Sequence, residues 1–250
     1  MADSKEVVFI TGANTGIGAG LARAFHARGA TVIASGRNRE GLEALASDCR
    51  GMEIELLDVC DTAAIGACAD RLSARHPDLN LVINNAGVQR LLSFAGGQPL
   101  AAAELDAELD TNLRGLIQVT NAFLPQLLRQ PRARLVQVSS ALAFVPLVAA
   151  PIYSATKAAV HAFTIALREQ LKHSSVQVVE LIPPAVKTEL HRGQTRRQID
   201  QMSLGEFTAA AMQGLDSGED EIAVGLAKAA RRFSRLMPQR LLKVVNRGGS

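Results

Sequence analysis

Tyr153 is the only tyrosine in the chain, and it opens the sequence YSATK, four residues before Lys157 and thirteen after Ser140. On a helix, residues i and i+4 share one face with Cβ atoms about 6 Å apart, so the phenol and the ammonium would face one pocket. A neighbouring ammonium favours the phenolate and would lower the pKa of the tyrosine from its usual value of about 10. The spacing predicts a proton-transfer site, although so short a pattern also arises by chance in structural helices.

A glycine-rich segment near the start predicts where a phosphate would bind. The apolar residues 7–10 lead into TGANTGIG at residues 11–18, and we expect a helix from about residue 17 to 28. Gly12, Gly16 and Gly18 remove side chains where the backbone turns sharply, approaches a pyrophosphate and packs against the helix. The free N–H groups at the start of that helix would face the phosphates. The G-x3-G-x-G spacing is weak evidence alone, but strand, turn and helix follow in the order of a dinucleotide site.

The residues after the second predicted strand, at 30–35, indicate which dinucleotide is preferred. An acidic residue there binds the ribose diol of NAD, whereas Arg37 offers a planar donor fork to the 2′-phosphate of NADP. Charge-assisted hydrogen bonds are worth about 1.5 to 3 kcal/mol, so we expect NADP(H) to be preferred, with Arg39 as a second candidate contact. The alternative is that these are ordinary solvated arginines.

These motifs resemble those of the short-chain dehydrogenase/reductase family along most of the chain. The matching features, in the family's order, are TGANTGIG, Asp58, NNAG at 84–87, Asn112 in TNLRG, Ser140, YSATK, and PPAVKT at 183–188. The resemblance implies that Ser140 holds a substrate carbonyl and that Tyr153 transfers the proton. It implies that Lys157 lowers the pKa of the tyrosine and binds the nicotinamide ribose, and that Asn112 holds a water. The cofactor contacts it implies are Gly12, Asn14, Thr15, Gly16, Ile17, Gly18, Arg37, Asp58, Val59, Asn85, Ala86, Gly87, Tyr153, Lys157, Pro183, Val186 and Thr188.

The chain departs from the family's pattern at three places. Thr15 stands where many NADP enzymes of the family carry a second basic residue, so selectivity rests mainly on Arg37. Pro184 replaces the usual glycine after Pro183 and fixes one more φ angle close to the expected nicotinamide site. The family's common C-terminal strand with its glycine pair is missing, and EIAVG at 221–225 is our candidate for the last strand.

Length and patterning predict an α/β fold, namely a doubly wound parallel sheet of Rossmann type in a single domain over residues 1–250. The 250 residues are 48% hydrophobic, enough for one large core. Strand-like runs at 52–57, 79–83, 134–138 and 176–181 alternate with helical stretches, which indicates a sheet covered on both faces. We expect residues 5–140 to form mainly the cofactor-binding part, 140–205 the catalytic and substrate-binding part, and 206–250 C-terminal helices with a short last strand.

Several classes of function are not expected from this composition. MADSKE at the start does not read as a signal peptide and no apolar run reaches 18 residues, so we expect a cytoplasmic protein without stable membrane insertion. Cys49, Cys60 and Cys68 lack paired zinc spacings, and they read as core fillers or unreactive thiols. The histidines are scattered, so no metal is expected. Aromatic residues are only 4%, which argues against nucleic-acid binding.

Two segments are candidates for the walls of a substrate pocket. The run ALAFVPLVAAPI at 141–152 contains two prolines, so it is neither a membrane span nor a regular helix. It would line a site for a hydrophobic carbonyl compound, although burial in the core explains it almost as well. Arg192, Arg196 and Arg197 in the other segment could bind an acidic group, or simply belong to a solvated loop.

The helix that carries Tyr153 is apolar nearly all round, with a stripe of small residues at Ala155, Ala159, Ala162 and Ala166. Such a helix needs cover on two sides, so we expect a homodimer or homotetramer formed with a helix at 105–128. From residue 226 onward the chain has seven basic residues and no acidic one. A polar helical face explains them best, with weak binding to an anionic membrane or an acidic partner as the alternative.

The leading functional prediction is NADPH-dependent reduction of a ketone or aldehyde, with Tyr153 as general acid and base and a small hydrophobic carbonyl or alcohol as substrate. A dehydratase, epimerase or enoyl reductase stays open within the enzyme class. From another class, an NADP-binding sensor or scaffold without turnover could keep the same fold.

Overall fold

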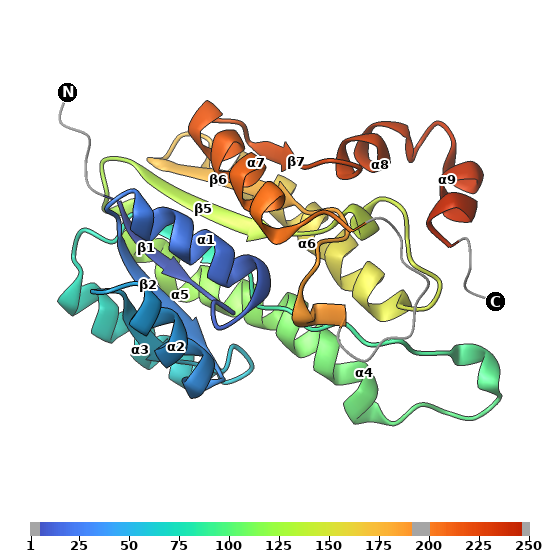
Figure 1. The fold of residues 1–250 in the computed structure, drawn as a ribbon, viewed down its shortest axis with the longest axis horizontal. Coiled ribbons are helices and arrows are strands. Elements are labelled where there is room, and N and C mark those ends of the chain that lie inside the picture. Colours follow the sequence, from blue (N-terminus) through green and yellow to red (C-terminus); the bar gives the residue numbers. More distant parts are fainter. Residues whose placement is uncertain (1–5, 192–200, 247–250) are drawn as a thin grey trace.

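The computed structural model describes residues 6–191 and 201–246. Within these residues, seven parallel strands form one sheet in the order β3-β2-β1-β4-β5-β6-β7 (Figure 1). Chain order reverses between β1 and β4, and the predicted doubly wound α/β fold is confirmed. The strands are β1 (Val7–Ile10), β2 (Thr31–Gly36), β3 (Glu53–Leu56), β4 (Leu81–Asn84), β5 (Ala133–Val138), β6 (Val176–Ile182) and β7 (Glu221–Ala223).

Helices cover both faces of the sheet because successive residues of a strand point to opposite sides. In β1, Val8 and Ile10 join one core cluster and Val7 and Phe9 the other. The first cluster is closed by α1 (Gly16–Ala27), α2 (Arg39–Asp48) and α7 (Leu204–Ser217). The second is closed by α3 (Thr62–Arg75), α5 (Leu116–Leu128) and α6 (Pro151–Leu171). Phe9 stacks on Phe123 of α5 with ring centroids 4.6 Å apart, inside this second core.

The helix predicted at 105–128 begins earlier, at the start of α4 (Ala102–Leu109), and is not regular throughout. A π-helical turn, Asp110–Gly115, separates α4 from α5. Such turns widen a helix by one residue and are frequent at functional sites. The motif TNLRG lies within it, so the turn decides where Asn112 points.

The proline-interrupted run at 141–152 forms a 3-10 turn (Ala141–Ala143) and an irregular segment before α6 begins at Pro151. The prediction of an irregular segment is therefore confirmed. Two further 3-10 turns are Phe94–Gly96 and Glu189–His191.

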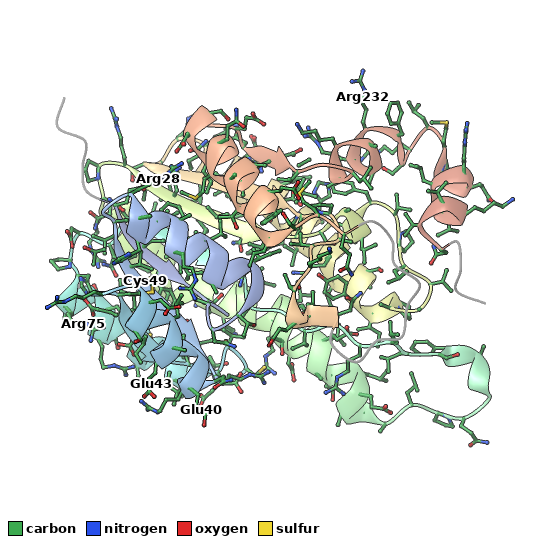
Figure 2. All side chains as sticks on the ribbon, in the orientation of Figure 1. Arg28, Glu40, Glu43, Cys49, Arg75 and Arg232 are labelled. Carbon is green, nitrogen blue, oxygen red and sulfur yellow. The ribbon has the colours of Figure 1, made fainter. Side chains whose placement is uncertain are left out.

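The predicted last strand is confirmed as β7, and two helices follow it, α8 (Ala227–Phe233) and α9 (Pro238–Val245). They extend from the β7 edge of the sheet (Figure 1). The six basic side chains of this segment that lie within the described residues are all exposed, and Figure 2 shows Arg232 pointing outward from α8. This agrees with a polar helical face; Arg247 lies outside the described residues.

Two predicted absences can be compared with the described part of the chain. None of its helices has the length and apolar character needed to cross a bilayer. Over the same residues, His, Cys, Asp and Glu side chains form no group of three or more that could hold a metal ion.

The three cysteines are free, and Cys60 is exposed rather than a core filler. Burial raises the pKa of the Cys68 thiol to about 11, so this thiol is unreactive at neutral pH.

Candidate active site

A cleft of about 1180 Å³ opens at the carboxyl ends of the parallel strands, where the loops after β1, β4, β5 and β6 meet. In open α/β sheets, ligands bind at this edge, at the point where the strand order reverses. Most of the predicted site residues line the cleft. Those that line it are Gly12, Asn14, Thr15, Gly16, Ile17, Arg37, Val59, Asn85, Ala86, Gly87, Ser140, Tyr153, Lys157, Pro183, Val186 and Thr188.

The turn between β1 and α1 needs glycine for two different reasons. Gly12 and Gly16 have φ angles of +64° and +57°, in the left-handed region that side chains rarely adopt. A Cβ on Gly12 would also lie 2.7 Å from Cα of Ala86, and one on Gly18 would lie 2.4 Å from the carbonyl oxygen of Gly12. Gly18 does not line the cleft; its lack of a side chain permits close packing of α1 on the turn.

The N-terminus of α1 faces this cleft, and within the described residues the N–H groups of residues 16–18 make no hydrogen bond. Thr15 is its N-cap, and among the described residues its side chain makes no capping hydrogen bond. The residues of the first turn, Gly16 to Ala19, are small or apolar. Free N–H groups and the positive end of the helix dipole form a site suited to a phosphate.

Asn85 and Thr11 fix the ends of β4 and β1 against each other. The amide of Asn85 donates to the carbonyl oxygens of Thr11 at 2.9 Å and Gly12 at 3.0 Å. In return the Thr11 hydroxyl accepts from the backbone N–H groups of Asn85 at 3.0 Å and Ala86 at 3.1 Å. This network holds the glycine turn rigidly beside the NNAG segment, so the two cofactor motifs form one surface.

Arg37 follows β2 at the rim of the cleft, with its side chain 59% exposed. Its Nη1 lies 3.8 Å from Oδ2 of Asp58, which follows β3. Asp58 also accepts a 2.9 Å hydrogen bond from the backbone N–H of Cys60 and does not itself line the cleft. The guanidinium is therefore only loosely paired and remains able to bind an anionic group.

Tyr153 and Lys157 lie one turn apart on α6, and both are buried at the floor of the cleft. The ammonium is 5.6 Å from the centroid of the phenol ring. Lys157 Nζ donates a 2.8 Å hydrogen bond to the carbonyl oxygen of Val138, the last residue of β5. Ser140, two residues beyond β5, accepts a 3.1 Å hydrogen bond from the backbone N–H of Leu142, which fixes its side chain. The fold thus brings together Ser140, Tyr153 and Lys157 in the cleft, as the sequence spacing predicted.

We expected Lys157 to lower the pKa of Tyr153. For the groups of the protein alone, this prediction is wrong. Burial raises the pKa of the phenol above its ordinary range; a hydrogen bond with Ser140 lowers it, and the charge of Glu108 raises it again. Burial lowers the pKa of Lys157 to about 8, opposed by the carboxylate of Glu180. Desolvation disfavours both charged forms. The ammonium donates to the carbonyl oxygen of Val138 and lies 5.6 Å from the centroid of the phenol ring.

Asn112 is fully buried within the π-helical turn and does not line the cleft. Its side chain accepts from the backbone N–H of Val88 and donates to the carbonyl oxygen of the same residue, both at 2.8 Å. It also donates to the Thr156 hydroxyl at 3.3 Å. Asn112 therefore links the loop after β4 to α6, and its predicted contact with a water stays a prediction.

One wall of the substrate side comes from a segment that sequence reasoning did not connect with the site. Val245, at the end of α9, packs with Leu147 and Tyr153 and lines the cleft. The side chain of the next residue, Asn246, accepts from the backbone N–H of Val148 at 2.8 Å and donates to the carbonyl oxygen of Pro146 at 3.1 Å. These partners are about a hundred residues apart, so no local pattern could have indicated them.

The apolar segment at 141–152 contributes Leu142 and Leu147 to the cleft, as predicted for a wall of the pocket. Val148, in contrast, is 64% exposed. Arg192, Arg196 and Arg197 lie outside the described residues. The described part of the neighbouring segment adds Glu189 and Leu190 to the lining.

A switch-point cleft with a glycine turn and a buried tyrosine–lysine pair defines a dinucleotide-dependent α/β protein. The family model described as short chain dehydrogenase matches residues 6–199, and the chain therefore belongs to this family. The resemblance stated from the motifs is confirmed.

Characterised and uncharacterised relatives both resemble the chain. It is 34% identical over 249 residues to the uncharacterized oxidoreductase DltE of Bacillus subtilis (strain 168), covering 97% of each protein. It is 33% identical over 181 residues to the NADP-dependent 3-hydroxy acid dehydrogenase YdfG of Salmonella typhi, covering 72% of each. Among solved structures, a short chain dehydrogenase from Burkholderia cenocepacia J2315 in complex with NADP superposes with a TM-score of 0.84 at 28% identity. That likeness covers 98% of this chain and 99% of the other.

Proposed function

We propose that this oxidoreductase is an NADPH-dependent carbonyl reductase that transfers a hydride to a ketone or aldehyde and can run in reverse when NADP and alcohol accumulate. The observation that carries the proposal is the convergence of Ser140, Tyr153 and Lys157 beside the glycine turn in one cleft. The NADP in the Burkholderia structure and in the name of the Salmonella enzyme supports the cofactor.

The residues of the cleft fit a dinucleotide phosphate. Gly12 and Gly16 line the cleft without side chains, so their backbone is accessible to a pyrophosphate, and the first turn of α1 offers its N–H groups to it. Arg37 would bind the 2′-phosphate, and Pro183, Val186 and Thr188 would border the nicotinamide. When bound, NADPH supplies the hydride that reduces the carbonyl carbon.

The proton side of the reaction falls to the protein. The Ser140 hydroxyl would donate to the carbonyl oxygen and polarise it, and the Tyr153 hydroxyl would give it the proton. Because burial raises the pKa of Tyr153, the phenol stays protonated at neutral pH, as a proton donor requires. Lys157, held by Val138, would bind the ribose and stabilise the phenolate left after transfer.

The lining supports a hydrophobic substrate. Leu142, Leu147, Leu190 and Val245 face the part of the cleft next to Tyr153. An apolar surface of this kind favours a carbonyl compound with apolar substituents over a charged one.

The test is NADPH consumption over a panel of ketones and aldehydes, with Tyr153→Phe as the key variant. We expect Tyr153→Phe to lose about 10²- to 10⁴-fold in turnover while NADPH binding, measured by calorimetry, is unchanged. Equal turnover by the variant would remove Tyr153 from the chemistry. NADPH binding with no turnover on any carbonyl would instead support the sensor or scaffold alternative.

We also propose that the chain forms a homo-oligomer through α5 and α6. The predicted small-residue stripe is exposed at Ala155, Ala162 and Ala166. Two larger apolar side chains are also exposed, Ile165 of α6 at 45% and Ile117 of α5 at 36%. An apolar face of this kind is stabilised when a second copy covers it. A monomeric mass by sedimentation at micromolar concentration would contradict this proposal. Cytoplasmic localisation stays a prediction.

A further inference from the structure

Glu108, at the end of α4, is a fully buried carboxyl group that the proposed reaction does not use. Its Oε1 accepts a 2.8 Å hydrogen bond from the backbone N–H of Arg90, in the loop after β4. Within the described residues, Oε2 makes no hydrogen bond of normal geometry. Burying a carboxylate with so few partners is costly, so its position next to the proposed proton donor calls for a physical reason.

That reason begins at the N-terminus of α6, which lacks a cap of its own. The N-cap residue is Ala150, which has no polar side chain, and the first helical residue is Pro151, which has no N–H. The N–H of Ser154 bonds to the carbonyl oxygen of Ala150, which leaves those of Ile152 and Tyr153 without helical partners. A negative charge at this end is favoured by the helix dipole.

Glu108 supplies that charge from a different helix. Burial raises the pKa of its carboxyl group. The backbone N–H and the positive charge of Arg90 lower it again, as does the backbone N–H of Tyr153. Because α4 packs on α6, the buried carboxyl group lies beside the first turn of the tyrosine helix. It links the end of α4, the loop after β4 and the first turn of α6.

The same charge acts on the phenol. The charged and titratable groups around Tyr153 come from four elements: Glu108 from α4, Arg90 beside it in the loop after β4, Lys157 from α6 and, behind the lysine, Glu180 from β6. Lys157 and Glu108 act in opposite directions on the phenolate, since one is positive and the other negative. Removing the carboxylate would leave the lysine's influence unopposed on that side.

We propose that Glu108 is a positioning residue that anchors the backbone of Tyr153 and keeps its phenol protonated, which biases the site toward carbonyl reduction. This inference deepens the proposed function and rests on Tyr153 as the proton donor. Its electrostatic part, however, can be measured without any substrate.

The chain has one tyrosine and no tryptophan, so the ultraviolet absorbance of phenolate reports Tyr153 alone. The experiment is an absorbance titration of the folded protein with saturating NADP+, comparing wild type with Glu108→Gln. The glutamine keeps the shape of the side chain and an acceptor for Arg90, and removes only the charge. We expect the acidity constant of the phenol to rise by about 10-fold or more, with the midpoint at lower pH.

Asp106→Asn is the matched control, because it removes the same charge from an exposed position on the same helix. Its midpoint should equal that of wild type. Should Glu108→Gln fail to fold, Glu108→Met removes the charge in a side chain of similar length and predicts the same direction of shift. In a kinetic readout, the limb of kcat/KM for alcohol oxidation that reports the base should move with the midpoint.

Equal midpoints in wild type and the Glu108 variants, or no titration of any of them before unfolding, would overturn the proposal. A loss of thermal stability without a shift would reduce Glu108 to a structural cap and likewise overturn it. Failure of the proposed function has a different signature, because Tyr153→Phe would then keep its turnover while the midpoint in Glu108→Gln still shifts.

Discussion

The ammonium of Lys157 donates a 2.8 Å hydrogen bond to the carbonyl oxygen of Val138, joining the tyrosine helix α6 to the end of strand β5. This bond holds a buried cation in an apolar core at the floor of the cleft. Because burial disfavours the charged form, the pKa of Lys157 falls from 10.5 to about 8. Keeping the Lys157 ammonium charged in this buried position therefore lowers the stability of the fold.

That cost predicts a pH dependence of folding. Since the folded pKa of Lys157 lies below the unfolded one, the unfolded chain binds more protons between pH 8 and 10.5. The free energy of unfolding of wild type should therefore gain about 3 kcal/mol from this group as the pH rises through that window. Lys157→Met should lack the gain. Urea unfolding of both proteins at a series of pH values measures it, and parallel curves would contradict the prediction.

The second prediction concerns Arg37 and cofactor choice. Arg37→Ala should weaken NADPH binding by about 10- to 150-fold and leave NADH binding nearly unchanged, because only NADPH carries the 2′-phosphate. Arg39→Ala is the comparison, since Arg39, our second candidate contact, is similarly exposed but does not line the cleft and pairs with Glu43 at 3.6 Å. Calorimetry with both dinucleotides measures the effect. Equal losses for NADPH and NADH would show that Arg37 does not select the phosphate.

The third prediction separates the two demands on Gly12. Gly12→Ala should destabilise the fold by more than the roughly 1 to 2 kcal/mol that a left-handed residue costs, because its Cβ would also meet Cα of Ala86 at 2.7 Å. Gly29→Ala is the matched control, with a φ of +82° and nothing within 4 Å of its Cβ. Urea unfolding compares them. Similar losses in both would mean that the β1 turn yields to the methyl group.

The fourth prediction tests the wall formed by α9. Asn246→Ala removes the bonds to Val148 and Pro146, each worth about 0.5 to 1.5 kcal/mol, and should loosen Val245 over the cleft. KM for an apolar carbonyl substrate should rise several-fold while KM for NADPH stays constant. Gln239→Ala, exposed on the same helix, should change neither. An unchanged substrate KM for Asn246→Ala would exclude α9 from substrate binding.

Much of the fold and the cofactor side of the site could be predicted, because their causes are local. Alternation in β1 and the left-handed turn at Gly12 depend on neighbouring residues, and the strands were placed within two residues of their observed ends. The π-helical turn around Asn112 was not predicted, since nothing in the periodicity of 105–128 distinguishes it from regular helix.

The sequence by itself determined which chemical groups this protein brings to its cleft, because a spacing of four residues on a helix fixes one shared face for Tyr153 and Lys157. Only the tertiary structure decided their protonation. Burial, the hydroxyl of Ser140 and the carboxylates of Glu108 and Glu180 set the pKa values, and these partners come from other elements. Proton affinity depends on everything packed around a group, and packing across a fold is not written in the spacing of a motif.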